Sequence, residues 1–184
     1  MRLFVAVNLP PDVQQSIHSA TAALRSAIED VRWTAPESLH VTVKFLGSVA
    51  ATQLDAIASS LSAIAAMHSP FRLRIGALDA FPTAHRPRIW ILHVEHDGAL
   101  ERLQRDVEAR LEQHGFAREE RPYRPHVTLG RARRGSTPAQ PPAMLRSRSS
   151  GEFLVETIDL MSSHTSPGGA RYERLATAPL AKEN

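Results

Sequence analysis

The sequence contains no cysteine among its 184 residues. This absence excludes disulfide bonds, zinc sites built from thiolates and a cysteine nucleophile, and it leaves histidine and carboxylates as side-chain metal ligands. One such group, His93, Glu95, His96 and Asp97, lies where a predicted strand runs into a turn. No second cluster with ligand spacing accompanies it. We therefore expect surface residues there, and neither a metal nor another cofactor.

The sequence also contains no run of about 18 apolar residues, the length typical of a membrane-spanning helix. The apolar residues 3–7 are soon followed by Pro10 and Pro11, which makes the segment too short for a signal peptide. With 42% hydrophobic and 22% charged residues, the composition is that of a folded globular protein, long enough for one substantial core or for two small lobes that share one. We expect a cytoplasmic protein with no membrane partner.

A four-residue pattern occurs twice: residues 40–43 read HVTV and, 86 positions later, residues 126–129 read HVTL. Two copies with apolar second and fourth positions are expected by chance with a probability well under about 0.01. On a strand, side chains alternate between faces, so each histidine points the same way as the threonine two residues on. The apolar neighbours then point into the core.

The paired motifs indicate acid–base chemistry on a phosphate. Imidazole titrates near neutral pH, so one ring can accept a proton while the other donates one. The threonine hydroxyls can hold a phosphate or a similar oxyanion. This arrangement needs no metal.

Arginine supplies 20 of the 22 basic residues, and the net charge is only +3. Six arginines flank the second motif: Arg118, Arg121, Arg124, Arg131, Arg133 and Arg134. Guanidinium groups match phosphate oxygens in bidentate fashion, so this bias favours a phosphate-bearing partner. A solvated arginine-rich surface is the alternative for any one of them.

Hydrophobic periodicity predicts alternating strands and helices. We expect strands at residues 3–7, 39–46, 71–75, 88–94, 125–129, 153–161 and 171–176. One helix is expected from Asp12, which can cap it, to Ile28, and two more at residues 52–67 and 99–114, with a loop between residues 75 and 88. Residues 131–151 predict a loop that could act as a flap, with or without a short helix at 144–148, and residues 167–169 predict a turn. Each half of the chain thus carries one motif strand, so we expect two related lobes facing each other across a cleft.

Five stretches of the chain resemble the two-histidine phosphoesterase superfamily, and more narrowly the RNA 2′,3′-cyclic phosphodiesterases, once described as 2′-5′ RNA ligases. They are residues 2–7, 33–47, 81–82 with 86–88, 121–129 and 167–172. The resemblance implies an α+β, bilobed, pseudo-symmetric fold in which two antiparallel sheets line a central cleft and helices pack outside. Residues 1–184 would form one catalytic domain of two intertwined lobes. It further implies metal-independent hydrolysis of RNA or nucleotide 2′,3′-cyclic phosphates to 2′-phosphomonoesters, with 2′-5′ ligation as the reverse reaction, in a monomer that takes part in RNA processing.

The resemblance also implies roles for individual residues. His40 corresponds to the proton donor and His126 to the acceptor, although the near-symmetric motifs make these roles reversible on sequence grounds. Thr42 and Thr128 would bind substrate, and Arg131 resembles a family arginine near the phosphate. Strict alternation puts Arg131 on the other face from His126, so the strand must bend or end near Gly130. Residues 162–166 depart from the family, where a stretch containing Glu and Ser is common.

Two further substrate-binding candidates are Lys44 and Tyr123. Lys44 shares a strand face with His40 by alternation, so it either neutralises the phosphate or reaches solvent. Tyr123, like Phe4 and Phe45, either stacks on a base or belongs to the core. The alternative function is a non-catalytic RNA-binding module that uses the same basic cleft.

Overall fold

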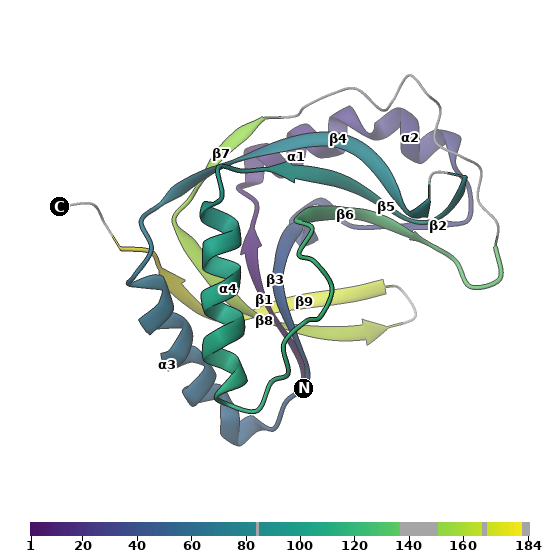
Figure 1. Cartoon of the computed structure of the whole chain (residues 1–184). Helices are drawn as coiled ribbons and strands as arrows, with labels where there is room; N and C mark the ends of the chain where they lie inside the picture. Colours follow the sequence, from purple (N-terminus) through teal and green to yellow (C-terminus); the bar gives the residue numbers. More distant parts are fainter. Residues whose placement is uncertain (84, 137–150, 167–168, 182–184) are drawn as a thin grey trace.

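Nine strands, all paired antiparallel, make up one sheet in the computed structural model, which describes residues 1–83, 85–136, 151–166 and 169–181 (Figure 1). The strands are β1 (Arg2–Asn8), β2 (Val31–Trp33), β3 (His40–Ser48), β4 (Phe71–Thr83), β5 (Arg86–Glu95), β6 (His126–Ala132), β7 (Glu152–Val155), β8 (Thr157–Ser166) and β9 (Gly169–Pro179). Their order is β7-β4-β5-β6-β3-β1-β8-β9, and β2 pairs with β6. The helices are α1 (Pro11–Ala20), α2 (Ala22–Ala27), α3 (Leu54–Ala65) and α4 (Ala99–Glu112), with short 3₁₀ turns η1 (Pro36–Ser38) and η2 (Ala51–Gln53).

The two motif strands lie in the middle of this sheet, where its two halves meet. β3 pairs with β1 at seven positions and β6 pairs with β5 at five. Between β3 and β6 the register holds one pair, Val41 with Val127. The predicted α+β class and antiparallel pairing are confirmed, and this single pair joins the two expected sheets into one.

A strand–helix–strand unit leads to each motif. β1, α1, α2, the short β2 and β3 follow one another in the first half, and β5, α4 and β6 do so in the second. In both units the first and last strands are neighbours in the sheet. The chain therefore brings both motifs to the centre by the same local route.

Helices α3 and α4 stand side by side next to one half of the sheet (Figure 1), where α3 contacts β8 and β9 and α4 contacts β3. Apolar residues recur every three or four positions along α4, and the face they form is fully buried: Leu100, Leu103, Val107 and Leu111.

None of the helices in the described part of the chain has the length and apolar character needed to cross a membrane.

Four local expectations are wrong. The helix expected from residue 12 to 28 is divided at Thr21, whose hydroxyl donates to the carbonyl of Ile17, and Asp12 does not cap it, because Pro10 occupies that position. The expected loop at 75–88 is largely strand, since β4 runs to Thr83 and β5 starts at Arg86. The strand expected at 153–161 is two strands, β7 and β8, and β2 was not expected. The loop expected at 131–151 starts later, since β6 runs to Ala132, and residues 137–150 of it, with the short helix at 144–148 and most of the turn at 167–169, lie outside the described residues.

Gly130 lets β2 lie close against β6. A Cβ atom there would lie 2.7 Å from Cε3 of Trp33 and 2.8 Å from Cγ1 of Val31. We expect Gly130→Ala to lower the free energy of unfolding by about 1–3 kcal/mol, because overpacking displaces both neighbours. Urea denaturation measures this. Gly76→Ala is the milder comparison, since its Cβ would lie 3.2 Å from the flexible end of Glu95 and 3.3 Å from the carbonyl oxygen of His93, with no contact under 3.0 Å. Equal losses for both variants would contradict the tight approach of β2.

Candidate active site

A cleft of about 690 Å³ opens over the centre of the sheet, and both motifs line it. His40, Thr42, His126 and Thr128 all belong to its lining, together with Arg131. Val41 and Val127, between the motif residues, are fully buried on the other face. The alternation expected from the sequence therefore holds within each motif, and the structure brings the four predicted histidine and threonine residues to one cleft.

Each motif imidazole is held by the same hydrogen bond. Nδ1 of His40 lies 2.8 Å from the carbonyl oxygen of Ser38, and Nδ1 of His126 lies 2.8 Å from that of Arg124. A carbonyl oxygen only accepts, so Nδ1 carries a proton and donates it in both rings. In the neutral rings Nε2 is then the free acceptor, which is the atom that proton transfer requires.

The pKa of each ring is displaced downward. Burial lowers the pKa of His40, the hydrogen bond to Ser38 raises it, and the charges of His126 and Arg131 lower it further. Burial also lowers the pKa of His126, where the bond to Arg124 raises it and the charges of Arg131 and His93 lower it. Both rings are therefore neutral near pH 7 while the cleft holds no anion.

Aromatic rings pack against both imidazoles. His40 packs against Phe4, at 4.9 Å between ring centroids, and edge to face against Tyr172, at 5.0 Å, and these two rings also contact each other at 5.3 Å. Phe81 meets His126 edge to face at 5.5 Å. These contacts limit the rotation of each ring and keep its Nε2 in place.

One extra residue follows the threonine of each motif. Ala6 pairs with Thr42 and Val5 with Lys44, so Val43 is the additional residue in β3. Ile91 pairs with Thr128 and Trp90 with Gly130, so Leu129 is the additional residue in β6. Each is a β-bulge, and beyond it the alternation of side chains is inverted.

The bulges decide which later residues reach the cleft. Arg131 lines it, as the family resemblance implies, because the bulge at Leu129 turns it to the face of His126. In the equivalent position of β3, Phe45 lines the cleft and is 69% exposed. Phe4 also reaches the cleft but is otherwise buried in the core. The bend that Arg131 requires is thus present.

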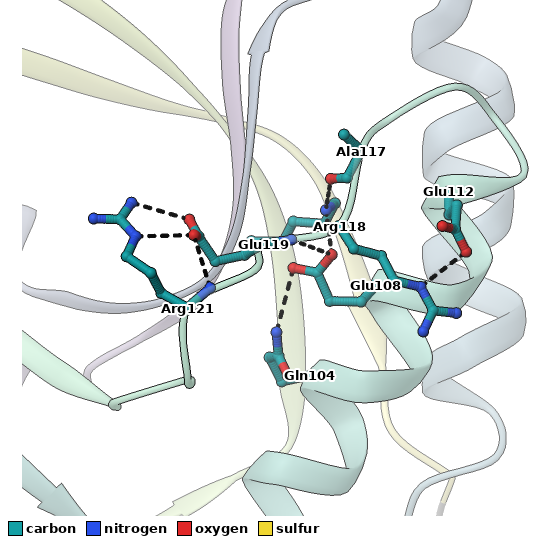
Figure 2. A network of polar contacts seen from close by, with 8 residues as sticks. Gln104, Glu108, Glu112, Ala117, Arg118, Glu119 and Arg121 are labelled. Carbon is teal, nitrogen blue, oxygen red and sulfur yellow. Dashed lines mark hydrogen bonds and ion pairs between the residues drawn. The ribbon is translucent and has the colours of Figure 1, made fainter.

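Lys44 does not reach the cleft, and the expectation that it shares a face with His40 is wrong. The bulge at Val43 turns its side chain to the rear of the sheet, where it is buried and forms an ion pair with Glu108 of α4. Lys44 also donates to the carbonyl of Ala117 at 2.7 Å. Figure 2 shows Glu108 at the centre of this network. Its carboxylate also accepts hydrogen bonds from the side-chain amide of Gln104 and from the backbone N–H of Glu119.

Tyr123 also lies behind the motif strand. Its hydroxyl donates to the backbone carbonyl of Thr42 at 3.0 Å, and burial raises the pKa of this phenol above its usual range. The ring packs against the main core rather than lining the cleft. Tyr123 therefore supports the backbone of the first motif and does not stack on a ligand there.

A polar pair lies next to each motif histidine, with one member on the neighbouring strand and the other on the strand beyond it. Asn8, opposite His40 in the register, donates to the buried carboxylate of Asp159 at 2.7 Å. His93, opposite His126, lies 3.0 Å from the carboxylate of Asp79. The nearby His96 accepts the backbone N–H of Gly98 through Nδ1. Within the described residues, no group of three or more histidines and carboxylates is arranged to hold a metal ion.

The cleft contains residues that sequence reasoning did not propose for the site. Arg2, Arg32, Trp33 and Tyr172 line it. Arg32 and Trp33 belong to β2, which is too short to give a periodic signal. Ser163 also lines the cleft, in the stretch where the sequence departs from the family that it resembles.

Comparison with known proteins gives a consistent result. The model of the 2′-5′ RNA ligase superfamily matches residues 9–167. A curated protein of Archaeoglobus fulgidus named RNA 2′,3′-cyclic phosphodiesterase is 32% identical over 176 residues, which is 95% of this chain and 98% of that protein. One of the same name from Geobacillus stearothermophilus is 31% identical over 96% of this chain, and the match spans 56% of that longer protein. A crystal structure from Thermus thermophilus superimposes with a TM-score of 0.84 at 28% identity and covers 100% of both chains.

The downward pKa shifts predict how the two rings titrate. Histidine-selective NMR should give midpoints below about 6.5, the unperturbed value, for His40 and His126. Inorganic phosphate in the cleft should raise both midpoints, because its negative charge favours the protonated rings. Midpoints at or above 6.5 without phosphate, or rings indifferent to it, would contradict this electrostatic description.

Proposed function

The chain belongs to the 2′-5′ RNA ligase superfamily, and from this we propose that it hydrolyses RNA 2′,3′-cyclic phosphates to 2′-phosphomonoesters without a metal ion. The observation that carries the proposal is the matched pair of imidazoles. Both line one cleft, both donate Nδ1–H to a backbone carbonyl, and both keep Nε2 for proton transfer. The curated relatives bear the name of this activity.

In the proposed reaction, His126 is the base and His40 is the acid. Nε2 of His126 takes a proton from water while the water oxygen bonds to phosphorus. The bond from phosphorus to the 3′ oxygen breaks, and protonated His40 gives its Nε2 proton to that oxygen. The phosphate stays on the 2′ oxygen. Because the substrate carries a negative charge, its binding favours protonation of one of two rings that are otherwise neutral.

Thr42, Thr128 and Arg131 are the proposed phosphate ligands. The two hydroxyls flank the imidazoles on the same strands, and the guanidinium of Arg131 lies near enough to lower the pKa of both rings. In the transition state, charge increases on the non-bridging oxygens, and hydrogen-bond donors held in advance stabilise it. Lys44 and Tyr123 have no part in this proposal.

Both halves of the chain are needed for the proposed site. β3 supplies one histidine and β6 the other, and each half-sheet holds its own motif strand. We therefore propose one catalytic unit made by a single chain. With a 5′-hydroxyl in place of water as the nucleophile, the same groups would open the cyclic phosphate to a 2′-5′ phosphodiester, and this would account for a 2′-5′ ligase activity.

Replacing either histidine tests the mechanism. With 2′,3′-cyclic AMP as substrate and a chelator present, we expect wild type to release 2′-AMP and to show a bell-shaped pH profile. His40→Ala and His126→Ala should each lower kcat by at least about 10²-fold, the usual contribution of one positioned acid or base. His96→Ala is the matched control, because His96 lies outside the cleft lining, and it should stay within threefold of wild type.

The outcomes separate the candidate functions. A non-catalytic RNA-binding module would release no 2′-AMP, and a metal-dependent phosphodiesterase would be silenced by the chelator. Turnover by either alanine variant within threefold of wild type would rule out the two-histidine mechanism.

A further inference from the structure

The polar pairs beside the two motifs occupy equivalent positions in the sheet. Asp159 is in register with Thr42 across β1, and Asp79 is in register with Thr128 across β5. In each half, the residue opposite the motif histidine contacts this carboxylate. These residues are Asn8 in the first half and His93 in the second. The two halves therefore match in the carboxylate and differ in the side chain opposite the motif histidine.

Asn8 brings no charge next to His40. Its amide donates to Asp159 at 2.7 Å, and this buried carboxylate also accepts from the hydroxyl of Thr177 at 2.6 Å. Arg174 lies 3.6 Å from the same carboxylate and balances its charge. Because an amide does not titrate, the residue opposite His40 has the same charge at every working pH.

His93, by contrast, is a titratable group next to His126. Nε2 of its ring lies 3.0 Å from the carboxylate of Asp79, and the two side chains form an ion pair when the ring is protonated. The charge of His93 is one of the causes that lower the pKa of His126. His93 does not belong to the cleft lining. The ring therefore acts on the reaction through His126 rather than through the substrate.

The other charged groups around this pair keep their charge near neutral pH. Arg131 of β6 is the second cation whose charge lowers the pKa of His126. On β5 itself, exposed Glu95 is opposite exposed Arg74 of β4, so these two opposite charges are neighbours. Arginine and glutamate do not change charge between about pH 6 and 8, whereas histidine does. Among these groups, His93 is therefore the one whose charge changes in the range where the site works.

The proposed reaction requires that only one of the two motif rings is protonated. A bound cyclic phosphate favours a proton on either imidazole, but the reaction needs it on His40. Burial and the charges of His126 and Arg131 lower the pKa of His40, so these surroundings do not select His40 as the protonated ring. A cation opposite His126 makes protonation of His126 less favourable. The selection can therefore come from the second half of the sheet.

We propose that His93, held by Asp79, is a positioning residue for the proton: its charge opposes protonation of His126, which stays free to accept the proton of water while His40 is the protonated ring. This inference rests on the proposed function and adds to it the group that distinguishes two otherwise equivalent histidines. The position equivalent to His93 in the first half is Asn8, which cannot act in this way.

Histidine-selective NMR on the protein without substrate tests the electrostatic step. His93→Gln should raise the titration midpoint of His126 by at least about 0.3 pH unit and leave that of His40 within about 0.2, as expected of one charge acting through water at the spacing of neighbouring strands. The shift should shrink at about 1 M salt, where the screening length falls to about 3 Å, because a structural cause would not depend on salt.

His164→Gln is the matched control. His164 is also an exposed histidine next to a carboxylate, at 3.8 Å from Glu173, and it does not belong to the cleft lining. This variant loses the same side chain from another place on the sheet. It should leave the midpoints of both motif histidines unchanged.

The pH profile tests the effect on catalysis. With 2′,3′-cyclic AMP as substrate, the acid limb of kcat/KM reports the base of the free enzyme. His93→Gln should move this limb to higher pH by the shift that NMR gives for His126, so that kcat/KM falls about twofold below the midpoint and is unchanged above it. His164→Gln should keep the wild-type profile.

The outcomes separate this inference from the proposed function. An unchanged His126 midpoint in His93→Gln, equal shifts of both motif histidines, or the same shift in His164→Gln would overturn the role of His93. A shifted midpoint with an unmoved acid limb would overturn it as well. Failure of wild type to release 2′-AMP would instead reject the proposed function, and the NMR titration, which needs no substrate, then decides by itself whether His93 acts on His126.

Discussion

A single additional residue after each motif threonine determines which side chains meet in the cleft. The bulges at Val43 and Leu129 occupy equivalent positions in β3 and β6, and beyond each the alternation of the strand is inverted. Arg131 and Phe45 enter the cleft for this reason, and Lys44 leaves it. The cleft thus has two equivalent His-x-Thr motifs at its centre and chemically different ends, one aromatic and one basic.

The rear of the sheet explains how two strands joined by one residue pair keep their motifs together. The ion pair of Lys44 with Glu108 ties β3 to α4, and the network in Figure 2 extends it to the segment that leads into β6. Tyr123 bonds to the carbonyl of Thr42 and is next to Arg124, whose carbonyl orients His126. The support of one motif is therefore connected to the support of the other.

The sequence was sufficient to predict what depends on local periodicity. Two-residue alternation places His40 with Thr42 and His126 with Thr128, and helical spacing identifies α3 and α4. The bulges were not predictable, because an additional residue is defined only against the register of a partner strand. The predicted position of the Lys44 side chain is wrong because the position depends on that register. The bend needed for Arg131 is predicted correctly. β2 is not predictable because three residues are too few to show a periodic pattern. The loop expected at 75–88 is wrong because Gly and Pro residues, which usually end a strand, are tolerated in this long hairpin.

The central claim is that the two imidazoles act in the same step on one phosphorus atom. Its most direct test is a double-mutant cycle on the hydrolysis of 2′,3′-cyclic AMP with His40→Ala, His126→Ala and the double variant. Residues that act as a unit are strongly non-additive, so the account predicts that the double variant is little slower than the slower single variant. Losses in kcat/KM that multiply in the double variant would show that the two histidines act independently, and would contradict the account.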